Sequence, residues 1–482
     1  MNITRSLARQ LRAVFRRAGI KSTPRDSGPW VFFQTGPQGL STRARSHEVA
    51  IEYHQAGDLP VEQLRVPLSL LGECEGRESS HVSLEAAAGG SVVASWTARG
   101  IPQQRTIEAT RETKADQPFP ERPERFIQNS PELITALLAA GDSSDSDSTR
   151  YALGRIQLRG RSGKIGATDG KQLLLQGGYE FPWPEDLLVA RPAVLGCPEI
   201  PRDQPVHVGR TEDWVCLAIG PWSIHLAIDK HGRFPKIDDC IPRTSAVVSR
   251  LQLDEQDAKF LTSSIEELPG GTDFNRPLTL DLNGQVLVRA KSNDQPRPTE
   301  VVLSGSRLIG EPLQVGMDRR YLSRALALGF RELQFVNPHS PVLCDDGQRQ
   351  FVWATLSPER DSTVPGSEVP EPIRIESGVA TPRAATETIA AVTPSIPQNR
   401  IQTMPQNSTN QPSSENQSEV NVTTKPAIRQ ASPIEEAIVL RDSLRDTLAK
   451  TNQLIHCLKQ QKRQSKLVAE TLASLKQLQA AG

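Results

Sequence analysis

One segment of this sequence is more informative than any other, and it reads Ala167-Thr168-Asp169-Gly170-Lys171-Gln172-Leu173. It follows a strand-like run at residues 151–158, and its Asp-Gly pair is typical of a turn. A short motif alone says little about a fold, so the flanking segments matter. Arg150-Tyr151-Ala152-Leu153 precedes it, and Gly232-Arg233-Phe234-Pro235 followed by Ile241-Pro242 comes after it.

Further short patterns extend this order toward both ends of the chain. Gly316-Met317-Asp318-Arg319-Arg320-Tyr321-Leu322 opens a helix-like stretch, and Asn337-Pro338-His339-Ser340-Pro341-Val342-Leu343 and Phe351-Val352-Trp353-Ala354-Thr355-Leu356 follow it. Nearer the start lie Glu48-Val49-Ala50-Ile51-Glu52 and Val66-Pro67-Leu68-Ser69-Leu70-Leu71.

In this order, the patterns resemble those of the bacterial DNA polymerase III beta subunit, the replicative sliding clamp. The resemblance covers about residues 1–356, weakly at the start and well from 125 onward. It implies an α+β fold of three tandem clamp domains, at 1–120, 121–243 and 244–356, with sheets outside and helices inside. It also implies a head-to-tail homodimer that closes as a ring around duplex DNA.

The chain continues for about 125 residues beyond the part that resembles a clamp. Residues 357–431 are rich in Pro, Ser, Thr, Gln and Asn, and such a composition predicts a disordered linker. Residues 432–480 return to helical periodicity, which predicts an amphipathic helix that either docks on a partner or forms a coiled coil. Its basic residues Lys459, Lys462, Arg463 and Lys466 are interpreted as a solvated face, with nucleic-acid contact as the alternative.

Four helices are expected in the globular part, at residues 7–18, after Ser130-Pro131, at about 254–268 and at about 318–328. In the first, the apolar residues fall within one arc, and arginines occupy the opposite face without a single acid. Like charges four residues apart repel one another, so this face predicts an anionic surface opposite it. The alternative interpretation is a helix face that contacts only solvent.

Phosphate neutralisation by such cations is independent of DNA sequence. The resemblance adds positions that approach DNA in the clamp family and further arginines on a candidate inner helix. The predicted DNA-binding residues are Arg5, Arg9, Arg12, Arg16, Arg150, Tyr151, Arg319, Arg320 and Arg324.

The resemblance also implies an apolar pocket between the second and third domains, where clamp loaders and polymerases insert a short peptide. The corresponding positions here are Leu153, Thr168, Gly170, Lys171, Gln172, Leu173, Pro235, Asp239, Cys240, Val352, Ala354 and Leu356. Asp239 stands where the family has a cation, and Ala354-Thr355-Leu356 thins the apolar wall beside Trp353. We therefore expect a pocket with weakened affinity for the ordinary peptide, as in a specialised clamp.

The sequence contains no signature of catalysis. There is no Walker A motif, nucleophile elbow, H-E-x-x-H motif or dinucleotide fingerprint, and the pair Asp238-Asp239 is interpreted as solvated. The six cysteines lack C-x-x-C spacing and are expected to be reduced, buried thiols of a cytoplasmic protein. No membrane span, metal or cofactor is expected, and the chain is predicted not to be an enzyme.

Two functions of different classes follow. The first is a processivity factor that encircles duplex DNA, associates with the nucleoid and tethers replication or repair proteins. The second is a scaffold that keeps the clamp fold, no longer loads on DNA and acts through its tail.

Overall fold

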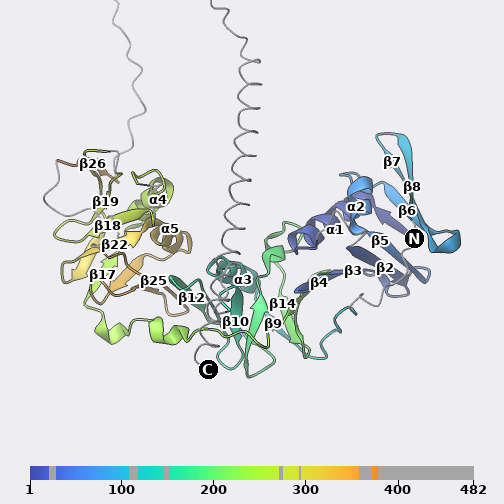
Figure 1. The fold of residues 1–482 in the computed structure, drawn as a ribbon, viewed down its shortest axis with the longest axis horizontal. Coiled ribbons are helices and arrows are strands. Elements are labelled where there is room, and N and C mark those ends of the chain that lie inside the picture. Colours follow the sequence, from blue (N-terminus) through green and yellow to red (C-terminus); the bar gives the residue numbers. More distant parts are fainter. Residues whose placement is uncertain are drawn as a thin grey trace, which may run out of the picture. The chain divides into compact units, whose positions relative to one another are not determined.

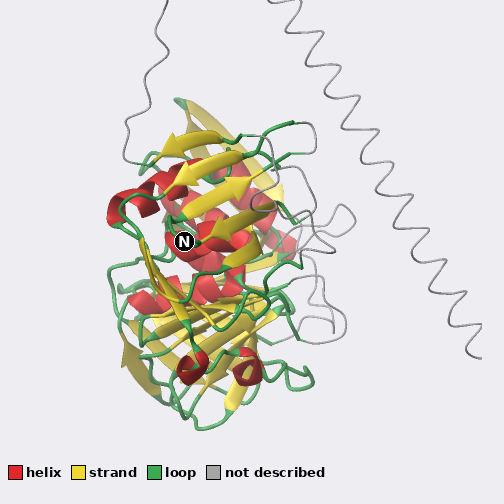
Figure 2. Ribbon diagram, turned by 90° about the vertical axis from the view of Figure 1, so that its left-hand side faces the viewer, coloured by secondary structure: helices red, strands yellow, loops and turns green. Residues whose placement is uncertain are grey.

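The computed structural model describes residues 1–20, 29–107, 118–145, 152–270, 275–292, 295–357 and 371–377. All of them belong to one compact unit, Met1–Thr386, which is shown in Figure 1 with many of its elements labelled. Figure 2 distinguishes the helices from the more numerous strands, and the predicted α+β class is confirmed. The predicted helix at 432–480 lies outside the described residues.

The chain repeats one order of elements three times: a strand, a helix, four strands, a second helical segment and three strands. The first copy begins at the N-terminus and carries a short 3-10 turn, η1 (Ala88–Gly90), between its last strands. Its elements are β1 (Asn2–Thr4), α1 (Arg5–Arg17), β2 (Trp30–Gly36), β3 (Gly39–Arg45), β4 (Val49–Gln55), β5 (Glu62–Pro67), α2 (Leu68–Cys74), β6 (His81–Ala86), β7 (Val92–Ala98) and β8 (Ile101–Ile107).

In the second copy, the second helical segment is only the 3-10 turn η2. Its elements are β9 (Phe126–Asn129), α3 (Glu132–Asp142), β10 (Arg155–Arg159), β11 (Lys164–Thr168), β12 (Gln172–Gln176), β13 (Asp186–Ala190), η2 (Ala193–Gly196), β14 (Val206–Arg210), β15 (Trp214–Ile219) and β16 (Trp222–Ala227). Two short turns, η3 (Ile237–Cys240) and η4 (Thr244–Ala246), connect it to the third copy.

The third copy has one additional strand, β21, and another strand, β26, follows it. Its elements are β17 (Ser249–Gln252), α4 (Glu255–Ser264), β18 (Pro277–Asp281), β19 (Leu287–Ala290), β20 (Thr299–Val302), β21 (Arg307–Gly310), β22 (Gln314–Asp318), α5 (Arg319–Ala327), β23 (Glu332–Phe335), β24 (Val342–Asp345) and β25 (Arg349–Trp353). β26 (Ile373–Glu376) lies within the stretch 357–431 that was predicted to be disordered, so this prediction is wrong for these four residues.

Two large sheets join the copies through antiparallel seams. The eight-stranded sheet has the order β5-β2-β3-β4-β16-β15-β14-β9, and its seam pairs β4 with β16. The nine-stranded sheet has the order β13-β10-β11-β12-β25-β24-β23-β17-β21, and its seam pairs β12 with β25. In both seams, the third of the four strands in one copy pairs with the last strand of the next copy. The sheets β1-β6-β7-β8 and β22-β18-β19-β20-β26 each belong to one end of this series.

Apolar burial connects the helices to these sheets. One core is continuous through the first and second copies, and a second core fills the third copy and includes Leu174 of β12. The helix α1 contacts α2 and η2, and α3 contacts η2 in turn. The sequence predicted α1, α3, α4 and α5 at nearly their observed bounds, because each has an apolar stripe of helical period.

Among the described cysteines, Cys74, Cys197, Cys216 and Cys344 are buried, as predicted, whereas Cys240 is exposed. Burial raises the pKa of the Cys74 and Cys216 thiols to about 12. The prediction of buried thiols is therefore wrong for Cys240, which lies in the short η3 turn rather than in a sheet. Within the described residues, no helix is long and apolar enough to span a membrane, and no group of three or more His, Cys, Asp or Glu side chains could hold a metal ion.

The seam between the first and second copies contains a buried histidine, His225 of β16, which pairs with Ala50 of β4 and is 1% exposed. Burial lowers the pKa of His225 to about 4, from an ordinary value near 6.5. Between these pH values, the unfolded chain binds a proton at this site and the folded chain does not. The stability that His225 gives as a neutral group is therefore complete above pH 6.5 and is lost as the pH falls.

We expect the free energy of unfolding to fall by about 2 kcal/mol more in the wild type than in a His225→Gln variant between pH 6.5 and 5. Urea unfolding curves at the two pH values measure this difference. Equal losses in the two proteins would show that His225 is not the group that titrates.

Candidate DNA interface and partner pocket

The helix α1 presents a row of cations to solvent. Thr4 caps the helix by accepting a hydrogen bond from the Leu7 amide, 3.1 Å away. Leu7, Leu11 and Val14 are buried on one face. Away from this face, the helix exposes three arginines and no acid; Arg9 and Arg16 lie opposite the apolar face, and Arg17 lies to one side. No neighbouring carboxylate on the helix neutralises these cations, which suits a polyanion.

Arg5 was predicted to share this face, and the structure corrects that prediction. Its side chain is 9% exposed, and its guanidinium donates to the carbonyl oxygens of Cys74, at 3.1 Å, and Glu75, at 2.9 Å. A further donation reaches the Thr97 carbonyl at 3.1 Å. Arg5 ties the start of α1 to the end of α2, so its donors are not available to phosphate.

Arg12 is less exposed than Arg9 and less buried than Arg5. It forms an ion pair with Glu75, and both side chains are partly buried. Arg17 was missed by the sequence analysis, since it stands apart from the row of Arg9, Arg12 and Arg16. Its exposed side chain donates from Nε to the Ala193 carbonyl, 3.2 Å away, beside η2. The signal that could have found it is the run Arg16-Arg17 in the last turn of α1.

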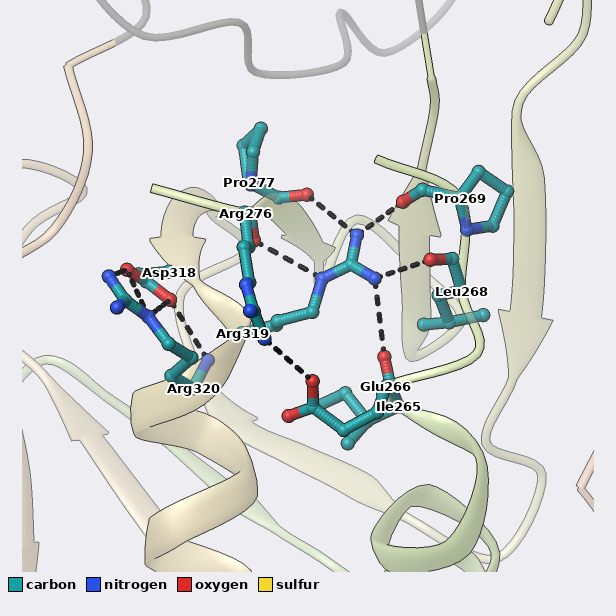
Figure 3. A network of polar contacts seen from close by, with 9 residues as sticks. All are labelled: Ile265, Glu266, Leu268, Pro269, Arg276, Pro277, Asp318, Arg319 and Arg320. Atoms are coloured by element: carbon teal, nitrogen blue, oxygen red, sulfur yellow. Dashed lines mark hydrogen bonds and ion pairs between the residues drawn. The ribbon is translucent and has the colours of Figure 1, made fainter. Parts of the chain in front are cut away.

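The predicted arginines of α5 serve the fold of the third copy. Arg319 is fully buried, and its guanidinium points into a group of backbone carbonyls from the residues that follow α4 and from the start of β18 (Figure 3). Arg320 forms an ion pair with Asp318, which caps α5. Arg324 donates to the Ala139 carbonyl at 2.7 Å and to the Ser143 hydroxyl at 3.0 Å, and so joins α5 to α3.

These contacts leave little cationic surface on the other helices. Neither α2 nor α3 contains Lys or Arg, and Lys259 of α4 pairs with Glu255 on the same helix. The predicted contacts Arg150 and Tyr151 lie outside the described residues. Among the described helices, α1 therefore has the strongest exposed positive face.

The predicted partner pocket surrounds the seam between β12 and β25. Leu173 and Val352 are opposite each other across this seam, and both are buried. Thr168 pairs with Leu173 on the other side, and its hydroxyl donates to the Gln172 carbonyl at 2.6 Å. Gly170 adopts φ +89°, a conformation that glycine reaches without strain, and a β-carbon there would lie 3.7 Å from Leu153.

A small apolar cluster lies here, separate from the two main cores. Its buried members are Leu173, Leu175, Ile237, Leu343 and Val352, and Phe234 and Ile241 pack against them. Leu173 and Val352 were predicted from the sequence motifs as pocket residues, and the other members were not. Alternation along β12 could have found Leu175, which points to the same side as Leu173.

The polar residues of the pocket lie at its edge. Lys171, Asp239, Cys240 and Ala354 are exposed, and Pro235 is half-buried. Gln172 is buried instead, and its side chain donates to Asp169 at 3.0 Å. Leu356 lies farther along the chain, where its amide donates to the Gly316 carbonyl at 2.8 Å.

One further prediction about this region needs correction. Trp353 does not stand beside the pocket, because it is buried on the opposite side of β25 in the core of the third copy. Asp238 is exposed, as predicted, and its carboxylate also accepts two hydrogen bonds of 2.9 Å from Arg159. This arginine holds the pKa of Asp238 below its usual value.

Bacterial sliding clamps share this architecture. A clamp (DNA polymerase III subunit beta) from Pseudomonas aeruginosa is 17% identical to this chain, with a TM-score of 0.60, and the match covers 74% of this chain and 99% of the clamp. The beta chain from Streptococcus pneumoniae is 14% identical, with the same coverage and a TM-score of 0.62. The Bacillus subtilis clamp is 13% identical, with a TM-score of 0.60, over 74% of this chain and 98% of the clamp. No family model and no curated protein sequence matches this chain.

The three copies and their two seams thus define a protein of the tandem clamp-domain class. More particularly, the chain has the fold of the bacterial DNA polymerase III beta sliding clamp, as predicted from its motifs. About a quarter of the chain has no counterpart in these structures.

Proposed function

We propose that this chain is a non-catalytic clamp that encircles duplex DNA as a head-to-tail dimer and tethers replication or repair proteins. The observation that carries the proposal is the acid-free exposed surface of α1, with Arg9, Arg16 and Arg17 exposed, on a body of three clamp copies. Contacts of this kind neutralise phosphates without reading bases. A closed ring needs only weak local affinity, because topology retains it on DNA.

The partner site of this clamp is the apolar cluster around Leu173 and Val352. We propose that an apolar peptide side chain packs against this cluster, as at other interfaces with a desolvated anchor. The exposed rim carries Asp239 and Lys171. We propose a peptide with a matching charge pattern, from a polymerase or clamp loader.

The scaffold function remains the second candidate because of a specific observation. Arg319, Arg320 and Arg324 are engaged within the protein, so the third copy offers fewer cations to DNA than the sequence predicted. A scaffold of this fold would bind partner proteins but would not bind DNA.

Equilibrium binding to two duplexes of unrelated sequence separates the two functions. The clamp proposal predicts equal affinities for both duplexes and a steep decrease in affinity with salt concentration. A strong sequence preference would contradict it, and no binding at low salt would favour the scaffold.

A further inference from the structure

The strand β26 covers the free edge of the last sheet although it belongs to none of the three copies. It pairs in parallel with β20, so that Ile373 lies opposite Thr299 and Glu376 opposite Val302. The Ile373 amide donates to the Pro298 carbonyl at 3.0 Å, and the Ser377 amide donates to the Val302 carbonyl at 3.1 Å. With β26 in place, all residues of β20 are buried.

The seams inside the chain indicate which strand of a second copy would pair with this edge. β4 of the first copy pairs with β16, the last strand of the second copy, and β12 pairs with β25, the last strand of the third. By this rule, β20, the third strand after α4 in the third copy, should pair with the last strand of a first copy. In a head-to-tail dimer, that strand is β8 of the other chain. β8 is the edge strand of its sheet, and nearly all of its residues are exposed, including Ile101 at 62%.

We propose that β26 covers the free edge of β20, the edge at which a second copy of the chain would assemble. β26 stays paired with β20 until β8 of that second copy displaces it. This inference rests on the proposed head-to-tail clamp. It assigns a regulatory role to the segment Ile373–Glu376, which lies beyond the clamp copies. An uncovered sheet edge is also a site of unspecific strand pairing, and the cover would protect it in the free chain.

The contacts of β26 suit a cover that can be removed. All four of its residues are exposed, with Ile373 at 53% and Ile375 at 41%, so it buries little apolar surface. At the seams, by contrast, the paired strands share five registered positions, and β12 is buried throughout. β8 extends over Ile101–Ile107, so it offers a longer strand than β26 for the same edge.

The two strands that compete for β20, namely β26 and β8, each carry an arginine. Glu300 of β20 is 3% exposed, and its carboxylate accepts from Arg289 at 2.5 Å and from Arg374 of β26 at 2.9 Å. Removal of β26 takes away one of these two cations. β8 carries an arginine of its own, Arg105, which pairs with Glu73 at 3.5 Å on the surface. Arg105 is therefore the residue that we expect to replace Arg374 beside Glu300.

The test measures the dimer dissociation constant of the full chain by sedimentation over a concentration series. The uncovered variant carries two substitutions in β26. Ile373→Pro removes the amide that donates a hydrogen bond to the Pro298 carbonyl, and Arg374→Glu places a like charge beside Glu300. The matched control is Arg161→Glu, in an exposed turn. We expect the dissociation constant to fall about tenfold in the uncovered variant, which is about 1.4 kcal/mol, and to stay unchanged in the control. Adding Arg105→Glu to the uncovered variant should reverse the gain.

Hydrogen exchange at a concentration where the chain is monomeric checks the contact itself. The amides of Thr299–Val302 should exchange faster in the uncovered variant than in the wild type. Faster exchange with an unchanged dissociation constant would overturn the inference and leave the clamp proposal standing. A weaker dimer would also overturn it, because β26 would then be part of the interface. If all variants stay monomeric and none is retained on circular DNA, both the clamp proposal and this inference fail.

Discussion

Replacing Arg9, Arg16 and Arg17 of α1 by glutamate should weaken duplex binding about 100-fold at 0.1 M salt, which is about 2.7 kcal/mol. These side chains are exposed on a helix whose buried face is untouched by the changes, so the fold should remain intact. Each lost phosphate contact should also reduce the slope of log affinity against log salt by about 0.9. Titrations at four or five salt concentrations measure both effects.

The control for this experiment keeps the change in net charge the same. Arg161, Arg202 and Arg243 are exposed and lie outside the helices, so their replacement by glutamate alters the charge of the whole protein equally. We expect a much smaller loss of affinity and an unchanged salt slope. Equal losses in the two triple variants would mean that net charge, rather than the face of α1, attracts the DNA.

Replacing Arg319 by methionine should destabilise the third copy by about 3 kcal/mol. The guanidinium of Arg319 donates to the carbonyls of Arg276, Ile265, Leu268, Pro269 and Pro277. Two of these carbonyls, those of Ile265 and Leu268, follow the C-terminal end of α4, where the helix dipole favours a cation (Figure 3). Methionine fills part of the volume but cannot donate to these carbonyl oxygens, and of the five only that of Arg276 keeps a donor at this residue, the backbone amide.

Arg320 supplies a matched control next to Arg319 in the sequence. Its side chain is 50% exposed and pairs with Asp318, so Arg320→Ala should cost less than about 1 kcal/mol. Urea unfolding of both variants, followed by tryptophan fluorescence, compares the losses. If Arg319→Met were no more destabilising than Arg320→Ala, the buried network would not stabilise the third copy as argued.

These two experiments also mark the limit of what local sequence patterns could predict. The helical period placed α1 and α5 correctly, because apolar burial is readable from spacing alone. The same period assigned Arg5 to a solvent-facing row, and the resemblance to clamps placed Arg319 on a DNA-facing helix. Both are buried because carbonyl groups distant in the sequence converge on them, such as Cys74 for Arg5 and Leu268 for Arg319. Such convergence depends on tertiary contacts that no local pattern contains.

The partner pocket shows the same division. The motif around Asp169 and Gly170 predicted the turn and placed Leu173 in the pocket. Alternation along β25 separates Val352, in the small apolar cluster, from Phe351 and Trp353, in the core of the third copy, and it could have prevented the misplacement of Trp353. Ile237 could not have been found in this way, since it reaches the cluster from the short η3 turn.

β26 was hidden by its surroundings in the sequence. The stretch Ile373-Arg374-Ile375-Glu376 alternates as a strand does, but it is only four residues long and lies in a region rich in Pro and Ser. Its order comes from its partner β20, which supplies backbone groups and the carboxylate of Glu300. A short strand of this kind becomes predictable only once the edge that it pairs with is known.

Retention on circular DNA distinguishes a ring that encircles the duplex from a protein that binds its surface. The full chain and the uncovered variant are each incubated with a nicked circular plasmid, washed at a salt concentration that abolishes binding to linear duplex, and recovered before and after the plasmid is cut once. The clamp account predicts that protein stays on the intact circle, more so for the uncovered variant, and is released when the circle is cut. Protein that leaves circular and linear DNA equally in that wash, in both forms of the chain, would contradict topological retention.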